Sequence, residues 1–292
     1  MAARDPALKK LGRYLALAAA VTFPAPAAVS AQPRDRPEKG GRLFPAGLLY
    51  APYLADPREV RFGVSLHAFE EARIADTGDL RWLLEMGGRF GILRLDGRGG
   101  RAWQIDFTAG FRGQFDVDHS QDNLGWDGIY GLALTGDLGG GWQILAGLHH
   151  VSSHVGDELQ ERTGRRRIGY TREELRLAVS RSLPSGLRLY ASAGYDPTDV
   201  NNDFQQPGRA QAGLELVRPL GPGRWQWYAA GDLTAFEEHD GDPGLALAAG
   251  WRIPTGDRAW RLGVGVYDGP VPIGELTTDS EREVFAGVWL DL

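Results

Sequence analysis

Residues 103–112 read WQIDFTAGFR, and apolar side chains stand at every second position from Trp103 to Phe111. Successive side chains of a β-strand point to opposite faces, so this stretch predicts a strand with one apolar face and one polar face. The same period recurs from about residue 61 to residue 292, in strand-length segments separated by Gly, Pro and Asp turns. About twelve such segments predict an all-β protein.

The lengths of the connections distinguish a membrane barrel from a soluble sandwich, which would show the same alternation. The short turns are at 97–100, 139–141, 184–186, 219–223 and 254–257. They alternate with longer polar connections near 70–79, 117–125, 153–166, 196–206, 236–243 and 268–280. This alternation is typical of bacterial outer-membrane barrels. We therefore predict an antiparallel up-and-down transmembrane β-barrel of about 12 strands over residues 60–292, with both termini in the periplasm.

The composition of the chain is consistent with such a barrel. Its 292 residues include 41 Gly, 9 Trp and 9 Tyr, as expected for tight turns and aromatic girdles, and no Cys. The predicted inner face carries both arginines and carboxylates, so we expect a crowded lumen that leaves at most a narrow pore. The formal net charge is -6, and it becomes -9 without the four basic and one acidic residues of positions 1–31. An acidic protein lacks the basic surface that nucleic acid requires.

The first 59 residues precede the alternating pattern. Residues 1–31 combine basic residues, an apolar run from Tyr14 to Phe23 and the small residues that end at Ala31, which predicts a cleaved signal peptide. The apolar run is too short for a membrane-spanning helix. Residues 32–59 are rich in Pro and Gly and show no period, so we predict an irregular periplasmic lead-in to the barrel.

Three sequence blocks carry a family resemblance. They are residues 54–59 (LADPRE) running into 61–63, residues 150–158 (HVSSHVGDE), and residues 267–269 (YDG) followed by 273–275 (IGE). Together they resemble the DUF1207 family of predicted bacterial outer-membrane proteins. The resemblance spans nearly all of the mature chain and implies a barrel without implying an activity. The last strand also resembles the C-terminal signal that the barrel assembly machinery binds, although Leu292 replaces the usual Phe. This machinery is therefore an expected partner.

The pair His150-x-Ser152 resembles outer-membrane phospholipase A, in which a His activates a Ser nucleophile on the outer barrel wall. His150 and Ser152 share the face that continues Leu148, so both should point toward lipid. Serine needs an adjacent base, and the base needs a group that fixes its tautomer. Glu173 on the following strand has the parity to lie beside His150. The phospholipase family uses Asn in that role and follows the Ser with Asn and Gly, whereas Ser153 and His154 occupy those places here.

Two other interpretations of this polar group remain open. Its residues could mark the rim where the strand leaves the hydrocarbon. The stretch from Trp142 to His150 contains 9 residues, and a strand spans the bilayer in roughly 9 to 11. Metal binding by His149, His150 and His154 is weaker, because His149 has the opposite parity. We expect no metal site and no cofactor, and no sequence motif of a common enzyme class appears.

A second candidate site is the arginine cluster of the longest connection. Arg162, Arg165, Arg166 and Arg167 could bind lipopolysaccharide phosphates, because guanidinium pairs with phosphate bidentately, or they could belong to a solvated loop. The sequence thus predicts an outer-membrane barrel that is structural or forms a narrow pore. The alternative is an outer-membrane lipid or ester hydrolase with Ser152, His150 and Glu173 as its catalytic residues.

Overall fold

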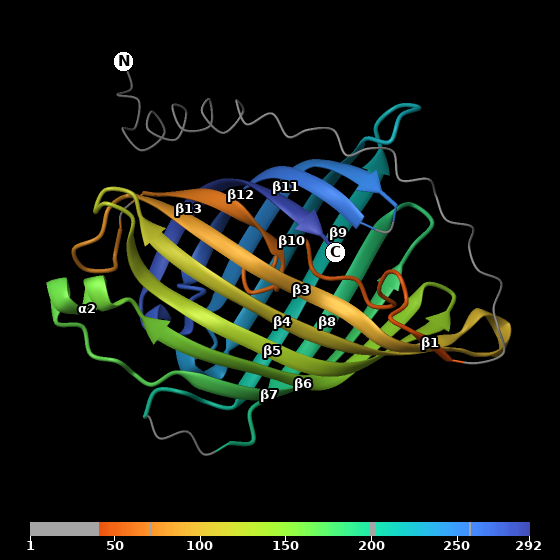
Figure 1. The fold of residues 1–292 in the computed structure, drawn as a ribbon, viewed down its shortest axis with the longest axis horizontal. Helices are drawn as coiled ribbons and strands as arrows, with labels where there is room; N and C mark the ends of the chain where they lie inside the picture. The colour runs from red at the N-terminus through yellow and green to blue at the C-terminus, as the bar shows by residue number, and fades with distance from the viewer. Residues whose placement is uncertain (1–40, 71, 199–202, 257) are drawn as a thin grey trace.

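The computed structural model describes residues 41–70, 72–198, 203–256 and 258–292, in which twelve antiparallel strands form a closed barrel (Figure 1). Each strand pairs with the next along the chain, and the last strand pairs with the first. The strands are β2 (Phe62–Phe69), β3 (Leu80–Asp96), β4 (Ala102–Asp116), β5 (Asp122–Gly139), β6 (Trp142–Val155), β7 (Thr171–Ser182), β8 (Leu187–Tyr195), β9 (Gly208–Pro219), β10 (Gln226–Phe236), β11 (Pro243–Thr255), β12 (Arg258–Pro270) and β13 (Ser280–Asp291). The predicted barrel of about 12 strands is confirmed. The signal peptide predicted over 1–31 lies outside the described residues.

The remaining elements are short. Strand β1 (Gly41–Leu43) pairs with β3 outside the closed ring, and helix α2 (Asp157–Thr163) lies between β6 and β7. Three single-turn 3₁₀ helices are η1 (Arg98–Gly100), η2 (Glu237–His239) and η3 (Gly274–Leu276). Within the described ranges, no helix has the length and hydropathy needed to cross a bilayer.

The two ends of the barrel differ in their connections, as the sequence predicts. At the short-turn end, tight turns join β3 to β4, β5 to β6, β7 to β8, β9 to β10 and β11 to β12. At the long-loop end, the other connections include α2, η2 and η3. Figure 1 shows α2 at this end and the turn between β3 and β4 at the opposite end. We use the names short-turn end and long-loop end below.

Alternation along each strand separates an apolar outer wall from a polar lumen. In β8, Leu189 and Tyr195 are exposed, whereas Arg188, Tyr190 and Ser192, at the alternate positions, are buried. Leucines and valines are exposed across the outer face of most other strands. A soluble protein would bury such a wall, whereas a barrel in a bilayer presents it to acyl chains.

The segment before β2 enters the barrel. Residues 32–59 were predicted to be an irregular periplasmic lead-in. Residues 32–40 lie outside the described residues, and within 41–59 Tyr50, Tyr53, Ala55 and Asp56 are buried against residues of the inner wall. The ring of Tyr53 stacks on Tyr190 of β8, with ring centroids 4.0 Å apart. We call residues 47–61 the inserted segment. It obstructs the lumen, so the inner wall is no free channel surface.

Arginines of the inner wall hold the inserted segment through its backbone. The segment has no regular structure, so its buried carbonyl groups need donors from elsewhere. A guanidinium offers five N–H groups and suits this task. The hydrogen bonds run from Arg89 to the carbonyl of Tyr50 (3.0 Å), from Arg188 to Ala51 (2.8 Å) and Pro52 (3.2 Å), from Arg261 to Leu54 (3.1 Å) and from Arg112 to Pro57 (2.9 Å).

An apolar cluster closes the long-loop end. The connection between β12 and β13 folds inward and buries Ile273 and Leu276 against Leu159 of α2. The other members of the cluster are Ile74, Leu124, Val155 and Val271. Glu275 fixes the same connection, because its carboxylate accepts the backbone N–H groups of residues 168, 169 and 170 at 2.8 to 2.9 Å.

Arg112 joins the inserted segment to this closed end. Its guanidinium pairs with Asp127 at 2.6 Å and donates to the carbonyls of Pro57 and Pro272. Asp127 is fully buried and also accepts the N–H of Gly274. One ion pair therefore contacts the inserted segment, the barrel wall and the connection between β12 and β13.

Arg112→Met should destabilise the barrel by roughly 3 to 5 kcal/mol, because it leaves the buried Asp127 carboxylate without its cation. Urea unfolding in micelles or vesicles measures the loss. The control is Arg166→Met at an exposed loop position, which should change stability by less than about 0.5 kcal/mol. Adding Asp127→Leu to Arg112→Met should recover part of the loss, and a double variant less stable than the single one would contradict this account.

Cysteines at Val64 and Val288 should form a disulfide and change migration on a gel. These residues face each other across the seam between β2 and β13, and the chain has no Cys of its own. The control pair, Val64→Cys with Val264→Cys on β12, has β13 between its members and should not cross-link. Equal cross-linking of both pairs would exclude this closure.

Candidate active site on the outer barrel wall

The residues predicted to be catalytic lie at the border between the apolar wall and the long-loop end. Register places Tyr130, His150 and Glu173 in one row across β5, β6 and β7. One step toward the barrel centre, the next outward row consists of three exposed leucines, Leu132, Leu148 and Leu175. Tyr195, also exposed, pairs with Leu175 on that level. The site therefore begins where the lipid-facing surface gives way to polar and aromatic side chains.

His150 is held by two contacts on the neighbouring strands. Its Nδ1 lies 2.5 Å from the Oε1 atom of Glu173, and its ring stacks on Tyr130 with centroids 4.1 Å apart. The predicted juxtaposition of Glu173 and His150 is thus present. Because the carboxylate engages Nδ1, the opposite nitrogen Nε2 is the one left to act as a base.

Ser152 lies between two imidazoles on the same face of β6. Its Oγ is 3.4 Å from Nε2 of His154, whereas no hydrogen bond joins it to His150 among the described residues. The expected Ser152–His150 hydrogen bond is therefore not made in this conformation. Residues two apart in a strand are about 7 Å apart, and the short serine side chain turns toward one neighbour at a time.

His154 also belongs to the site, although the sequence did not suggest it as a partner of Ser152. Its ring stacks on Trp126 of β5, with centroids 4.2 Å apart. The spacing His-x-Ser-x-His is the signal that places all three side chains on one face. His149 faces the other way, at the level of Glu174, so the three histidines do not converge on one point.

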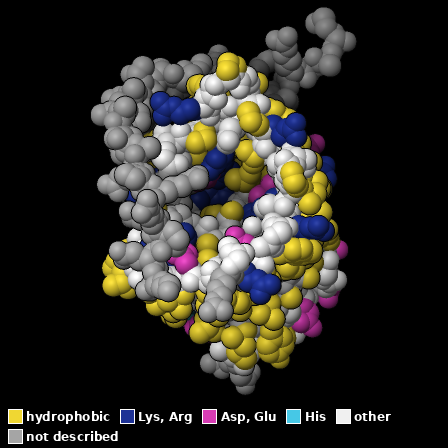
Figure 2. Space-filling model, turned by 90° about the vertical axis from the view of Figure 1, so that its right-hand side faces the viewer, with side chains coloured by type: hydrophobic (Ala, Val, Ile, Leu, Met, Phe, Trp, Pro, Cys, Tyr) yellow, Lys and Arg dark blue, Asp and Glu magenta, His cyan; other side chains and the backbone are white. Residues whose placement is uncertain are grey.

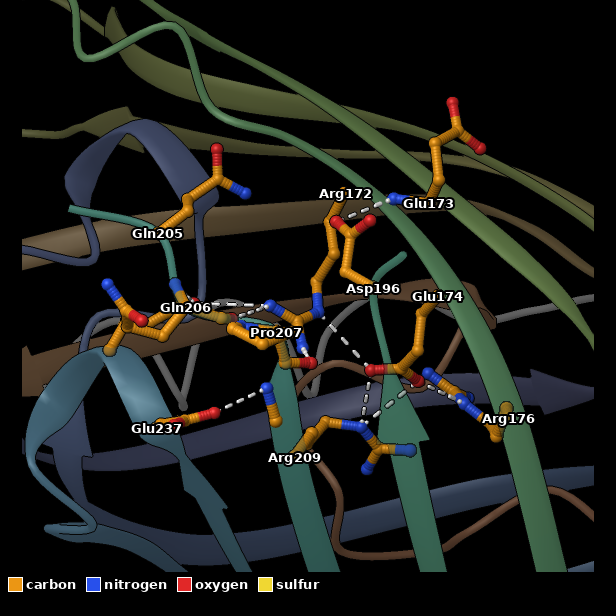
Figure 3. A network of polar contacts seen from close by, with 12 residues as sticks. Arg172, Glu173, Glu174, Arg176, Asp196, Gln205, Gln206, Pro207, Arg209 and Glu237 are labelled. Carbon is orange, nitrogen blue, oxygen red and sulfur yellow. Dashed lines mark hydrogen bonds and ion pairs between the residues drawn. The ribbon is translucent and has the colours of Figure 1, made fainter. Parts of the chain in front are cut away.

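A buried polar network lies behind the site, on the inner face of β7. Figure 3 shows Glu173 and Glu174 pointing to opposite sides of the strand. Glu174 accepts from Arg172 (3.3 Å), Arg176 (2.8 Å) and Arg209 (2.9 Å). A side chain at Gly194 would put its Cβ 2.3 Å from this carboxylate, so any larger residue there would displace the carboxylate from its present position. These contacts immobilise the strand that presents Glu173.

The loops beside the site are tied to this network. Arg172 pairs with Glu238 at 3.2 Å, and the hydroxyl of Tyr170 donates to the same carboxylate at 3.1 Å. Burial, followed by the nearby Glu238 charge, raises the pKa of Tyr170. Burial also raises the pKa of Glu238. Tyr170 therefore stays protonated and acts as a donor in this group.

Three of the four arginines predicted to contact phosphate form ion pairs, and two of them, Arg162 and Arg165, reach another connection. Arg162 pairs with Asp122 (2.5 Å) and Asp76 (2.9 Å), Arg165 pairs with Asp279 (2.7 Å), and Arg167 pairs with Asp157 (3.3 Å). Arg166 is exposed, and no ion pair of it is present among the described residues. Lipopolysaccharide binding by this cluster stays a prediction.

The three sequence blocks that resemble DUF1207 meet in space. Arg58, from the block at 54–59, donates to the carbonyls of Pro270 and Val271, beside the block that ends at Glu275. The backbone N–H of Glu275 donates in turn to the hydroxyl of Ser153, in the block at 150–158, at 2.8 Å. These blocks therefore build the interior that supports the outer-wall site, through contacts that alternation along one strand does not reveal.

Comparisons with known proteins agree with this fold. The family model described as "Protein of unknown function (DUF1207)" matches residues 33–273. The outer membrane phospholipase (OMPLA) dimer of Salmonella typhi superposes with a TM-score of 0.56 at 12% identity, covering 79% of this chain and 90% of that one. The phospholipase A of Escherichia coli gives 0.54 at 13% identity, covering 79% and 89%. No curated protein matches the sequence. At these identities the likeness concerns the fold.

Acid should loosen the connection between β12 and β13 through His239. Its Nε2 lies 3.0 Å from the hydroxyl of Thr277, and burial, followed by the positive charge of Arg58, lowers the pKa of His239 to about 4. The unfolded chain therefore binds the proton more readily, with a pKa near ~6.5. The contribution of neutral His239 to the free energy of unfolding is therefore complete above about pH 6.5 and is lost as the pH falls toward 4.

Hydrogen exchange of the peptide 271–279, corrected for the intrinsic rate, should show several-fold more opening at pH 4.5 than at pH 7. The carboxylates Glu238, Asp240 and Asp242 lie on the same connection as His239, so the comparison is made with His239→Gln, which keeps a polar side chain but cannot gain a charge. The pH dependence should be weaker in the variant. An identical dependence in both proteins would assign the effect to the carboxylates.

Proposed function

The chain belongs to the DUF1207 family, and we propose that it is an outer-membrane hydrolase that cleaves lipid acyl esters on its outer wall. The observation that carries this proposal is the contact of 2.5 Å between His150 and Glu173, next to Ser152 at the edge of the apolar wall. In this proposal Ser152 is the nucleophile, His150 is the general base and Glu173 orients the base. The short-turn end faces the periplasm, and the long-loop end faces outward.

The position of the site suits a lipid ester. Exposed leucines form the row immediately below it, and aromatic side chains accompany it, as at the boundary between acyl chains and headgroups. The ester groups of a lipid lie at this boundary. A lipid beside β6 could therefore present its carbonyl carbon to Ser152 without leaving the membrane.

The chemistry requires one rotation of the serine side chain. The Ser152 hydroxyl must turn from His154 toward His150, the imidazole that has a carboxylate partner. The hydrogen bond between a catalytic serine and its base is often long before substrate binds. Nε2 of His150 accepts the hydroxyl proton as Oγ adds to the ester carbonyl. The protonated ring then gives this proton to the departing alcohol, which leaves an acyl-serine. Water, activated by the same ring, releases the fatty acid and regenerates the hydroxyl.

The obstructed lumen favours this proposal over a pore. The inserted segment and the arginines that bind it occupy the inner wall, and the connection between β12 and β13 covers the long-loop end. The alternative function is that of a structural barrel without catalytic activity. The assay below distinguishes the two.

Ser152→Ala should lower turnover of a phospholipid or a chromogenic ester by about a thousandfold or more, because it removes the hydroxyl that forms the acyl intermediate. His150→Gln should have a similar effect, and Glu173→Gln should lower turnover by about a hundredfold. The measurement uses folded protein in mixed micelles. A fluorophosphonate should label Ser152, as detected by mass spectrometry.

Two matched variants serve as controls. Ser185→Ala removes an exposed hydroxyl in a turn at the other end of the barrel and should leave turnover unchanged. His154→Gln tests which imidazole is the base, and it should lower turnover far less than His150→Gln. Absence of hydrolysis, or hydrolysis that survives Ser152→Ala, would leave the structural barrel as the function.

A further inference from the structure

A cavity of about 520 Å³ opens at the short-turn end, away from the outer-wall site. Figure 2 shows this end of the barrel, where a hollow with basic side chains leads inward. The inserted segment forms one side of the cavity, through Tyr53, Leu54 and Val60, and the walls come from β3, β7, β8, β9, β11, β12 and β13. This volume is within the usual range of pockets that hold small molecules.

Arginines outnumber acidic side chains around this cavity. Five arginines line it, namely Arg61, Arg89, Arg188, Arg252 and Arg261. Three acidic residues line it, namely Glu59, Glu215 and Asp291. Glu215 pairs with Arg188 at 3.0 Å, and Asp291 pairs with Arg261 at 2.7 Å and with Arg252 at 3.3 Å. Arg61 pairs with Glu85 at 3.5 Å.

Arg89 is the one arginine of the five that takes part in none of these ion pairs. Its side chain is buried, with 9% of its surface exposed, and it forms no ion pair with a described residue. One Nη donates to the carbonyl of Tyr50 at 3.0 Å, and the buried Nε has no hydrogen-bond partner. A buried guanidinium without an anion is costly, so this position favours an anionic ligand.

The rest of the lining is largely aliphatic. Leu48, Leu183, Leu187, Val217 and Leu290 lie between the arginines. A small inorganic anion would leave these groups facing water. A ligand that combines one anionic group with an aliphatic body would cover both kinds of surface.

We propose that this cavity binds an anionic amphiphile, with its carboxylate or phosphate at Arg89 and its aliphatic part against the leucines. The proposal does not depend on the hydrolase activity, because no residue of the outer-wall site lines the cavity. The single charge at Arg89 selects for an anion, and the aliphatic lining selects against anions without a hydrocarbon part.

Calorimetric titration of the folded protein in non-ionic micelles tests this assignment, with titration into empty micelles as the blank. Octanoate and octyl phosphate are the anionic probes, and they distinguish a carboxylate from a phosphate head. Octanol lacks the charge, and acetate lacks the aliphatic part. We expect saturable binding of at least one of the two anionic probes, and much weaker binding of octanol and acetate.

Arg89→Gln should weaken this binding by about tenfold to a hundredfold, as expected for loss of a charged hydrogen bond. The control is Arg218→Gln, which removes an exposed arginine at the same end but outside the cavity and should have no effect. Glu59 forms no ion pair with a described residue and accepts the N–H of Tyr53. Glu59→Gln should therefore strengthen anion binding several-fold, a gain that misfolding cannot produce.

The proposal is overturned if neither anionic probe binds saturably, or if octanol or acetate binds as tightly as the better of the two. It is also overturned if a folded Arg89→Gln protein, checked by circular dichroism, binds as the native protein does. Should that variant fail to fold, the sign of the Glu59→Gln effect decides. Unchanged or weaker binding would overturn the assignment of an anion to this cavity.

Discussion

The hydrogen bonds from inner-wall arginines to the inserted segment are the interaction on which the rest of the structure depends. An irregular chain inside a barrel has no neighbouring strand to satisfy its carbonyl groups, and Arg112, Arg188 and Arg261 provide the missing donors. Because Arg112 also binds Asp127 and the connection between β12 and β13, the same contacts hold the long-loop end. The lumen thus has a structural role, and exposed chemistry is confined to the outer wall and the short-turn end.

Neighbouring residues of a strand have different roles here, because their side chains point to opposite faces of the barrel wall. On β7, Glu173 faces outward to His150 while Glu174 faces inward to three arginines. The inner contacts restrict the strand, and the outer side chain gains a defined position as a consequence. A site on a barrel wall is more rigid than one on a loop for this reason, which suits a base that must keep one tautomer.

The two candidate binding regions differ in what surrounds them. The outer-wall group lies beside exposed leucines and has access to molecules within the membrane plane. The cavity at the short-turn end is enclosed by the inserted segment and carries the buried Arg89. No residue of the outer-wall group lines the cavity, so the two regions are separate sites.

The sequence by itself determined the strand count, the alternating connections and the row that places Glu173 beside His150. These features depend on a period of two and on antiparallel neighbours, which a linear pattern contains. Only the tertiary structure placed residues 47–61 inside the barrel, because the contacts that hold them there come from strands distant in the sequence. It also directed the Ser152 hydroxyl to His154 and left Arg89 without an anion. Such contacts join residues that are distant in the chain or depend on a side-chain rotation, and no periodicity encodes either.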